Sequence, residues 1–515
     1  MKGLVSLVGS GPGDPGLLTL KAQECLRQAD LIVYDYLANP DHLRHAQKNA
    51  VKIGVGKGFR HKLLSQEKIN RLIISSAQKG KRVVRLKGGD PYLFGRGGEE
   101  ALLLEKNKIP FEVVPGVTSA TACAAYAGIP LTHRDHNSSI TFLTGHRAQD
   151  DSLDSIPWKK IAGIGGTLVI YMGLYNLPKI AKHLILAGMP PATAVAVIQW
   201  GTLPQQRTVV APLGDIALAV KKSKLGPPCI ILIGDVVSLR NKLGWFEKLP
   251  LFGKKILITR APDRAGSFRQ QLTGLGAEAI EMPLIQIEEP PDFKKMDQAI
   301  NDLKKGDWAV FASAYGVEAF FKRLHFLGLD TRYLAGIHIA SVGTKTSAAL
   351  LNHGVNTDLE PEQFESAAIL RALKKGKKEI KNKKFILFRT NIAPPDLEQN
   401  LKKAGALVKP VTAYCTTTPS KISADLKKMV LRGEVDFAAF TSASTVEGFV
   451  KHFGAKSARK IALKTHFLSI GPVTSKALKS YGLTPYLQAK TFTVDGLLEA
   501  LILDQTKKMK KKRKR

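Results

Sequence analysis

The second half of this 515-residue chain carries an internal repeat, which limits its fold more than any other feature of the sequence. Each copy predicts a strand, a helix and a strand, then a strand ending in a Ser turn and a strand ending in a Gly turn, each turn leading into a helix. Duplication of this unit predicts two similar α/β lobes. Three pairs of segments match 129 or 128 positions apart: ILITR at 256–260 with FILFR at 385–389, VFASA at 310–314 with AFTSA at 439–443, and SVG at 341–343 with SIG at 469–471.

The four turns of the repeat predict where a ligand binds. Ligands of α/β folds bind at the carboxyl ends of strands, so we expect Ser313, Ser442, Gly343 and Gly471 to line a cleft between the lobes. Backbone N–H groups and helix N-termini at these turns suit anions. The two serines equally suit helix capping, and the two roles are compatible.

A glycine-rich turn, GPGDPG at 11–16, follows a short apolar strand near the N-terminus and precedes a predicted helix over 17–29. With Asp35 further along, it fits the fingerprint of a dinucleotide-binding oxidoreductase. A pyrophosphate site needs free N–H donors at this turn, and Pro12 and Pro15 remove two of them. The sequence therefore argues against NAD binding and favours a turn built for close backbone approach.

Length and composition predict several folded domains in one chain. At ~150 residues per domain, 515 residues predict three or four, and 44% hydrophobic residues can fill their cores. Alternating apolar runs and helical patterns predict an α/β region over 1–245. A Pro/Gly-bearing joint predicts a linker over 246–253, a second α/β region follows over 254–502, and the basic run at 503–515 predicts a disordered tail.

The net charge of +34 favours anionic partners. A polycarboxylate and a nucleic acid both meet this condition, and so does a basic surface without a partner. No RNP-like aromatic motif or zinc knuckle accompanies the charge, so we do not expect the tail to contact nucleic acid.

The sequence argues against a membrane span, a secretory signal and a metal site. No apolar run reaches the ~18–20 residues that span a bilayer, and the N-terminal apolar stretch is too short for a secretory signal. We therefore expect a cytoplasmic protein without membrane contact. Scattered cysteines without a CxxC pair predict free thiols and no metal site: Cys25, Cys123, Cys229 and Cys415.

A set of motifs over about residues 1–245 resembles the uroporphyrinogen-III C-methyltransferases of the tetrapyrrole methylase family. The motifs are GPGDP at 11–15, VVRLKGGDP at 83–91, FGRGGEE at 94–100, VVPGVTSA at 113–120 and GIPLTHR at 128–134. The resemblance implies a two-lobed fold that holds S-adenosylmethionine in its cleft. The cofactor contacts that it implies are Pro12, Gly88, Gly89, Asp90, Leu93, Thr118, Ser119, Met172 and Gly201. Leu93 and Ser119 stand where the family often has Ile and Ala.

The same resemblance implies the transfer of two methyl groups to uroporphyrinogen III, giving precorrin-2 for siroheme or cobalamin synthesis. Asp35 and Lys57 match the family's proton acceptor and donor. The family is dimeric, which implies a homodimer. Each of several basic residues is by itself typical of a surface salt bridge, but together they would suit the substrate's eight carboxylates: Arg85, Lys87, Arg96, His133 and Arg134.

The second half resembles uroporphyrinogen-III synthase, on ILITR at 256–260, the repeated Ser turns, GPVTS at 471–475 and Tyr414. The resemblance implies a two-lobed fold whose chain starts in one lobe, crosses to the other and returns. It implies closure of hydroxymethylbilane with loss of water, assisted by Tyr414, although this side chain also suits packing between lobes. Turn residues that suit the substrate's carboxylates are Ser313, Thr441, Ser442, Gly471 and Thr474.

Together the two resemblances predict a bifunctional enzyme of tetrapyrrole biosynthesis with no metal cofactor. The alternative is a methyltransferase whose C-terminal module is catalytically idle.

Overall fold

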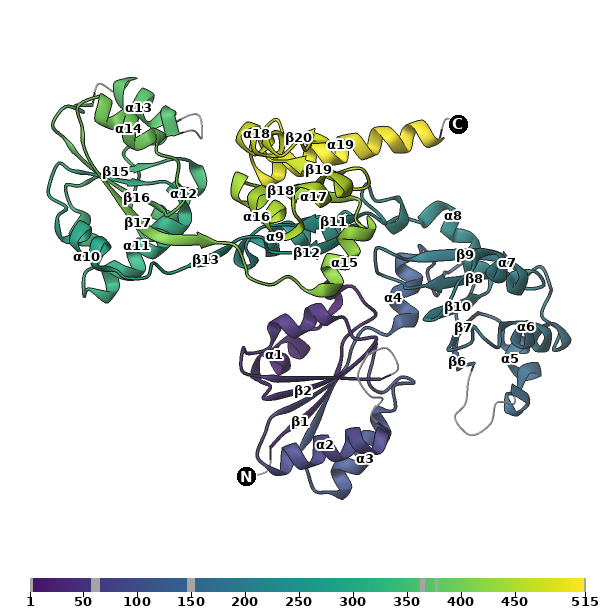
Figure 1. Ribbon diagram of the computed structural model, residues 1–515. Helices are drawn as coiled ribbons and strands as arrows, with labels where there is room; N and C mark the ends of the chain where they lie inside the picture. Colours follow the sequence, from purple (N-terminus) through teal and green to yellow (C-terminus); the bar gives the residue numbers. More distant parts are fainter. Residues whose placement is uncertain (1–2, 57–64, 146–152, 362–365, 376–377, 514–515) are drawn as a thin grey trace. The chain divides into compact units, whose positions relative to one another are not determined.

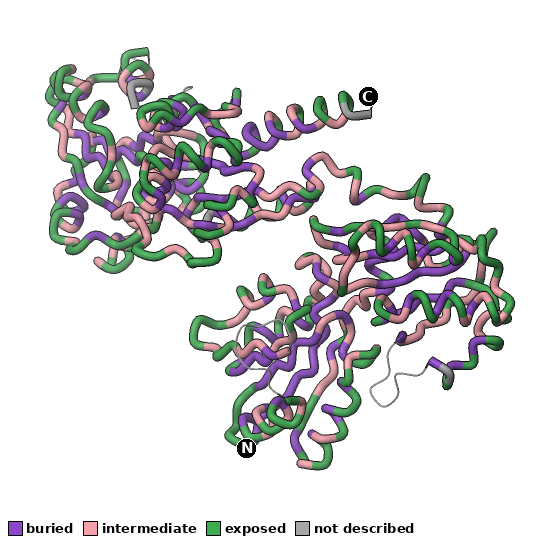
Figure 2. Tube along the Cα trace, turned by 45° about the vertical axis from the view of Figure 1, so that its right-hand side comes forward, coloured by how far each residue is buried: buried purple, intermediate pink, exposed green. Residues whose placement is uncertain are grey.

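A computed structural model describes residues 3–56, 65–145, 153–361, 366–375 and 378–513 (Figure 1). The chain divides into two compact units. The first comprises Met1–Ile256, Gln270–Ala279 and Leu501–Arg515, and the second comprises Leu257–Arg269 and Ile280–Ala500. Buried residues follow the strands of each sheet (Figure 2).

The first unit begins with a five-stranded parallel sheet in the order β3-β2-β4-β1-β5. Apolar clusters lie on both faces of this sheet, as expected for parallel strands covered by helices on either side. Its strands are β1 (Val5–Gly9), β2 (Leu31–Asp35), β3 (Val51–Val55), β4 (Val83–Lys87) and β5 (Phe111–Val114), with helices α1 (Leu20–Gln28), α2 (Gln66–Gln78) and α3 (Gly97–Lys106).

A second sheet of the same unit has the order β6-β7-β10-β8-β9 and is mixed, since only β6 and β7 pair in parallel. Helix α4 (Ser119–Tyr126) lies in the chain between the two sheets. The strands are β6 (Ile140–Thr144), β7 (Thr167–Tyr171), β8 (Ala194–Gln199), β9 (Arg207–Pro212) and β10 (Cys229–Ile233), with helices α5 (Trp158–Ile164), α6 (Leu177–Leu186), α7 (Ile216–Ser223) and α8 (Arg240–Leu243).

The predicted helix over 17–29 begins later than expected. Pro15–Leu17 forms a short 3-10 turn, and α1 begins at Leu20 because the Thr19 hydroxyl accepts the Ala22 N–H at 3.2 Å. A capping threonine therefore sets the start of this helix, not the end of the glycine-rich turn.

Downstream, the strands form two further sheets, β12-β11-β18-β19-β20 and β13-β17-β16-β14-β15. The first contains β11 (Lys255–Ile258), β12 (Glu278–Glu281), β18 (Phe437–Phe440), β19 (His466–Ser469) and β20 (Leu487–Gln488). The second contains β13 (Gln286–Glu288), β14 (Trp308–Phe311), β15 (His338–Ser341), β16 (Lys384–Thr390) and β17 (Leu407–Thr417).

The repeat does produce two similar lobes, but each lobe takes strands from both copies. In the sequence repeat, β11, β14 and β15 correspond to β16, β18 and β19. The sheets pair β11 with β18 and β16 with β14, so the copies exchange their second halves. Register follows the repeat, because Trp308 pairs with His338 and Phe437 pairs with His466. The chain therefore starts in one lobe, crosses to the other and returns, as the resemblance implied.

The four turns of the repeat begin helices at equivalent places. Ser313 caps α11 (Ala314–Phe326) and Ser442 caps α16 (Ala443–Phe453), while Gly343 and Gly471 precede α12 (Thr344–Asn352) and α18 (Pro472–Ser480). The predicted capping is confirmed for both serines. The remaining helices are α9 (Pro262–Gly274), α10 (Lys294–Asn301), α13 (Ser366–Lys375), α14 (Asp396–Lys403), α15 (Ala424–Arg432), α17 (Ala455–Ala462) and α19 (Val494–Arg513).

One sequence expectation requires correction. The predicted disordered tail at 503–515 is wrong up to residue 513, because α19 continues to Arg513. Buried Leu497 and Leu501 anchor its earlier turns, and Asp504 pairs with Lys508 at 3.5 Å one turn later. Within the predicted linker, buried Phe246 packs against Tyr126 with ring centroids 4.8 Å apart.

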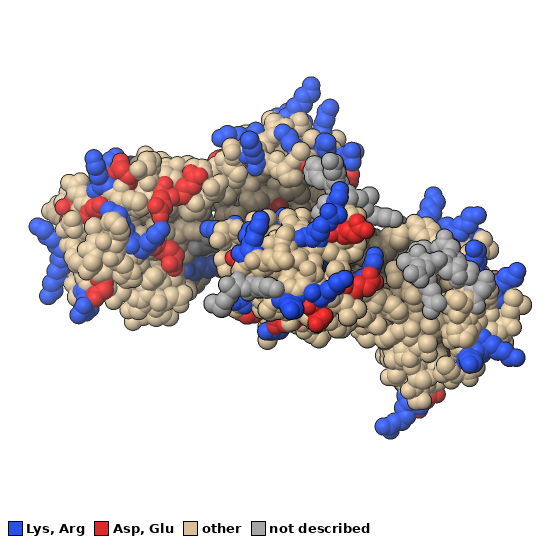
Figure 3. All heavy atoms as spheres, turned by 90° about the horizontal axis from the view of Figure 1, so that it is seen from below, with Lys and Arg blue, Asp and Glu red and all other residues tan. Residues whose placement is uncertain are grey.

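Lysine and arginine side chains are spread over the visible face in Figure 3, and do not gather in one patch. Within the part of the chain that the structure describes, no helix is both long and apolar enough to cross a membrane.

Candidate active sites

One cavity of about 220 Å³ in the first unit gathers residues that follow strands of both its sheets. Gly11 follows β1, Gly88 follows β4 and Met172 follows β7. The cavity therefore lies where carboxyl ends of strands meet, as expected for a ligand site of an α/β fold. All nine residues predicted to contact the cofactor line it: Pro12, Gly88, Gly89, Asp90, Leu93, Thr118, Ser119, Met172 and Gly201.

Two glycine turns form the wall of the cavity on the side of the parallel sheet. Gly11 and Gly89 form an isolated antiparallel bridge, with N–H···O distances of 3.1 and 2.8 Å. Both adopt left-handed conformations, with φ of 74° and 65°, which glycine reaches without steric cost. The absence of side chains here exposes backbone atoms directly to a ligand.

Most amide donors of the glycine-rich turn are already used. The Asp14 carboxylate accepts from the Gly16 N–H at 2.7 Å, and the Asp14 carbonyl accepts from the Leu17 N–H at 3.1 Å. The Asp14 N–H donates to the Thr202 hydroxyl at 3.0 Å, and the Tyr126 hydroxyl donates to the Asp14 carboxylate at 2.6 Å. A pyrophosphate would find few free donors, which strengthens the sequence argument against a dinucleotide.

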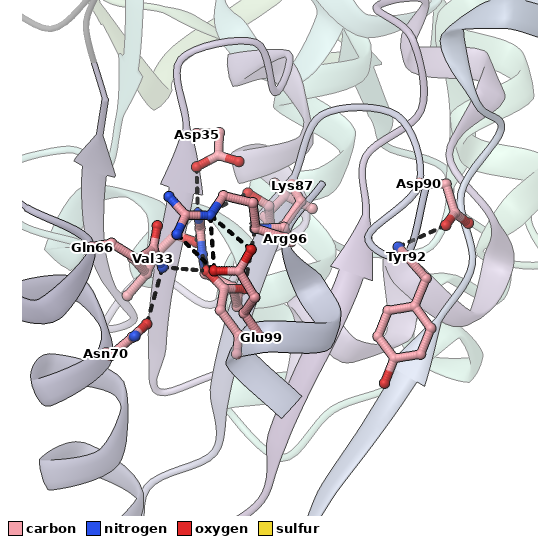
Figure 4. Close-up of polar contacts among 12 residues, drawn as sticks. Val33, Asp35, Gln66, Asn70, Lys87, Asp90, Tyr92, Arg96 and Glu99 are labelled. Carbon is pink, nitrogen blue, oxygen red and sulfur yellow. Dashed lines mark hydrogen bonds and ion pairs between the residues drawn. The ribbon is translucent and has the colours of Figure 1, made fainter. Parts of the chain in front are cut away.

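Asp90 organises the second glycine turn as well as lining the cavity. Its carboxylate accepts from the Tyr92 N–H at 2.8 Å, drawn in Figure 4, and from the Gly116 N–H at 3.1 Å. These bonds tie the turn after β4 to the loop after β5. Each carboxylate oxygen keeps a further lone pair, so Asp90 can still accept a bond from a ligand.

Tyr171 is a cavity residue whose role sequence reasoning missed. Its hydroxyl lies 2.6 Å from the Thr118 hydroxyl and accepts from the Ala120 N–H at 3.3 Å. Burial raises the pKa of Tyr171, and the Phe94 ring packs against it at 5.0 Å between centroids. The available signal was its place at a strand end, directly before the recognised Met172.

The cavity concentrates unusual backbone geometry. Phe94, Met172 and Trp200 line it with φ values of 55°, 53° and 48°. L-residues rarely adopt this region, and such strain clusters where surrounding structure must place a group for function.

Close packing explains why position 201 is glycine. A Cβ built on Gly201 would lie 2.3 Å from the Cys123 sulfur and 2.8 Å from the Cys123 Cβ, in α4. Burial raises the pKa of the Cys123 thiol to about 12, so this cysteine packs as an unreactive group.

The predicted acid–base pair is only half described. Asp35 ends β2 and its side chain is 32% exposed, held by Arg85 at 2.6 Å between Asp35 Oδ1 and Arg85 Nη2. Asp35 does not line the cavity, but Leu37, two residues further on, does. Lys57 lies outside the described residues.

Two of the basic residues predicted for substrate carboxylates are wrongly assigned. Arg85 and Lys87 are buried and pair with Glu100 at 3.0 and 3.1 Å, because the central β4 is covered on both faces. Arg96, in contrast, is exposed and pairs with Glu99 at 2.6 Å. The His133 side chain, 3.7 Å from Asp135, is 37% exposed, and Arg134 is exposed as well.

In the second unit, the Tyr414 hydroxyl contacts Ser313, the residue that caps α11. Its hydroxyl lies 2.9 Å from the Ser313 hydroxyl, which also accepts from the Gly316 N–H at 3.1 Å in the first turn of α11. Tyr414 is 8% exposed and packs against Tyr315 with ring centroids 5.6 Å apart. Thr474 is buried within α18, so its side chain cannot reach a substrate as readily as Ser313 can.

These features define a two-part α/β protein: a two-sheet unit around a glycine-walled cavity, followed by a duplicated pair of lobes. A model of tetrapyrrole (corrin/porphyrin) methylases matches residues 4–217, and a model of uroporphyrinogen-III synthase HemD matches residues 266–499. The porphyrin biosynthesis protein HemD of Ruminiclostridium josui is 39% identical over 97% of this chain and 98% of its own length. The chain therefore belongs to the family in which a tetrapyrrole methylase is joined to a uroporphyrinogen-III synthase.

Other relatives match one half each. The siroheme synthase of Hahella chejuensis is 50% identical over 48% of this chain, which spans only 52% of that protein. A uroporphyrin-III C-methyl transferase from Thermus thermophilus, solved with S-adenyl homocysteine, is 38% identical over 46% of this chain and 100% of its own, with a TM-score of 0.40. Both sequence resemblances are confirmed, and both halves belong to enzyme families of tetrapyrrole biosynthesis.

Proposed function

We propose that the first half, residues 1–245, binds S-adenosylmethionine in the glycine-walled cavity and transfers two methyl groups to uroporphyrinogen III, giving precorrin-2. One observation carries this proposal: Asp90 is the only charged residue among those described as lining the cavity. An acidic, otherwise uncharged site suits a cationic sulfonium, whereas a phosphorylated ligand would need cations or free amides.

The cavity residues suit the parts of that cofactor. Gly88 and Gly89 allow close approach of the ligand to the main chain, and Asp90 has lone pairs for ribose hydroxyls or for the positive charge. Met172 and Trp200 supply apolar surface for an adenine ring. The cofactor, when bound, supplies a methyl group on an electrophilic sulfur, and the protein's task is to hold that group in line with a pyrrole carbon.

Methylation of a pyrrole carbon requires a proton to leave the rearranging ring system, and we assign Asp35 as its acceptor and Lys57 as a donor. Asp35 supports this role because its carboxylate is fixed by Arg85 and remains partly exposed. A carboxylate held in one orientation near a cleft is suited to accept a proton from a bound substrate.

For the second half, residues 254–502, we propose closure of hydroxymethylbilane to uroporphyrinogen III with loss of water. Tyr414 donates its proton to the departing hydroxyl, and the Ser313 hydroxyl keeps the phenol at the start of α11. The positive end of that helix and the turns at Thr441, Ser442 and Gly471 bind substrate carboxylates.

One experiment tests both halves. The purified protein is given hydroxymethylbilane with and without labelled S-adenosylmethionine, and the tetrapyrroles are analysed. Uroporphyrinogen III without the methyl donor and a labelled dimethylated product with it are expected. Closure no faster than the spontaneous reaction would instead leave the C-terminal module idle. Calorimetry with S-adenosylhomocysteine and NADH tests the cavity separately, and tight binding of NADH alone would refute the methyltransferase assignment.

A further inference from the structure

Four charged side chains of the first unit form a continuous chain of ion pairs that runs from α3 to the end of β2. Its members are Glu100, Lys87, Arg85 and Asp35. We propose that Glu100 is a positioning residue for methyl transfer, acting on Asp35 through Arg85. The proposal rests on the role of Asp35 as proton acceptor.

Arg85 occupies the centre of this chain and has little freedom. Its side chain is 3% exposed, with Nη2 bonded to Asp35 Oδ1 at 2.6 Å and Nε bonded to Glu100 Oε1 at 3.0 Å. Nη1 lies 3.4 Å from the carbonyl oxygens of Val33 and Leu86. The planar guanidinium is thus fixed by Glu100 on one side and fixes Asp35 on the other.

Both carboxylate oxygens of Glu100 accept hydrogen bonds. Oε1 also accepts from Gln66 Nε2 at 2.9 Å, and Oε2 accepts from Lys87 Nζ at 3.1 Å. Gln66 donates in turn to Asn70, as Figure 4 shows beside Asp35 and Lys87. Burial alone would raise the pKa of Glu100, but Arg85 and Lys87 hold that pKa below its ordinary value, so Glu100 stays a carboxylate.

Stability alone gives little reason for such an arrangement. A buried ion pair is often no more stabilising than apolar side chains of the same volume, because desolvation offsets the attraction. Glu100 and Lys87 are as deeply buried as Arg85, whereas the Asp35 side chain is 32% exposed. Asp35 is the one member of this chain of ion pairs whose side chain is exposed to solvent. The orientation that Glu100 imposes on Arg85 therefore fixes the orientation of the Asp35 carboxylate.

The test is Glu100→Gln, which keeps the size of the side chain and removes its charge. Turnover of methyl transfer is expected to fall about tenfold or more, since a displaced proton acceptor costs rate more than binding. The affinity for S-adenosylhomocysteine, measured by calorimetry, stays unchanged. The matched control is Glu105→Gln, which alters an exposed carboxylate of the same helix and leaves turnover unchanged.

A double-mutant cycle with Asp35→Asn separates positioning from structure. If Glu100 acts through Asp35, Glu100→Gln costs little further turnover once Asp35 is replaced. If the turnover losses of the two single variants multiply in the double variant, the proposal is wrong and Glu100 is a structural residue. Asp35→Asn with wild-type turnover would instead refute the proposed role of Asp35, and this inference with it. Should Glu100→Gln fail to fold, turnover of Glu100→Gln/Lys87→Met is compared with that of Lys87→Met, since in both variants buried Arg85 keeps Asp35 as a partner.

Discussion

Replacing Gly201 by alanine tests whether close packing between α4 and the loop after β8 forms the cofactor cavity. The new methyl group would lie 2.3 Å from the Cys123 sulfur and 3.2 Å from the Cys123 Cα, so α4 and the loop after β8 must separate. Overpacking of this kind costs about 1–3 kcal/mol. For a domain of this size that corresponds to a fall in melting temperature of about 3–9 °C. Because both residues line the cavity, we expect the affinity for S-adenosylhomocysteine to fall about tenfold or more, as measured by calorimetry.

The control for this variant is Gly163→Ala in α5, where a Cβ meets nothing within 4 Å. That change should leave affinity unchanged and raise stability slightly, because alanine favours a helix interior. Adding Cys123→Gly to Gly201→Ala removes the two closest overlaps and should restore much of the affinity. Wild-type affinity and stability in Gly201→Ala alone would refute the packing argument.

Three further predictions concern single side chains. Tyr171→Phe removes the hydroxyl that meets Thr118 and should weaken S-adenosylhomocysteine binding by about 1–2 kcal/mol in calorimetry, whereas an unchanged Kd would contradict the role of this contact. Tyr414→Phe should slow formation of uroporphyrinogen III while leaving methylation of supplied uroporphyrinogen III intact, and full synthase activity would exclude Tyr414 as the proton donor. Burial lowers the pKa of His42 from 6.5 to about 4. Between these two pH values the unfolded chain binds a proton at His42 and the folded chain does not, so stability falls as pH drops from 6.5 toward 4. Urea titrations should show wild-type unfolding free energy falling by up to about 3 kcal/mol more than that of His42→Phe over this range, and parallel pH profiles would contradict it.

The cavity was predictable from sequence because its walls are turns with distinctive residues. Gly88, Gly89 and Asp90 directly follow the strand β4, and parallel strands place such turns at one edge of a sheet. Helix capping at Ser313 and Ser442 was equally readable, since a serine between a strand and a helix suits an N-cap. These signals depend only on neighbouring residues, so they can be read from the sequence without knowledge of the tertiary structure.

The roles of Arg85 and Lys87 were not predictable in the same way. Their alternation in β4 is that of a strand with one polar face, which favours exposure to solvent. The strand instead lies at the centre of the parallel sheet, and the carboxylate that pairs with both residues comes from α3. The order of strands in the sheet and the position of α3 depend on tertiary structure, and the sequence of residues 83–87 does not indicate either of them. The helical tail was missed for a related reason: Leu497, Leu501 and Gln505 recur every four residues, but the charge run concealed that spacing.

The exchange between the two copies of the repeat creates the candidate contact of the second half. Ser313 belongs to the first copy and Tyr414 to the second, and they meet because β14 of one copy pairs with β16 of the other. If each copy folded on itself, this serine and this tyrosine would lie in different lobes. The position 129 residues before Tyr414 is Ile285, so the other lobe lacks an equivalent phenol. Duplication supplied two similar helix N-termini, and a single tyrosine, brought by the exchange, distinguishes the lobe in which we place the chemistry.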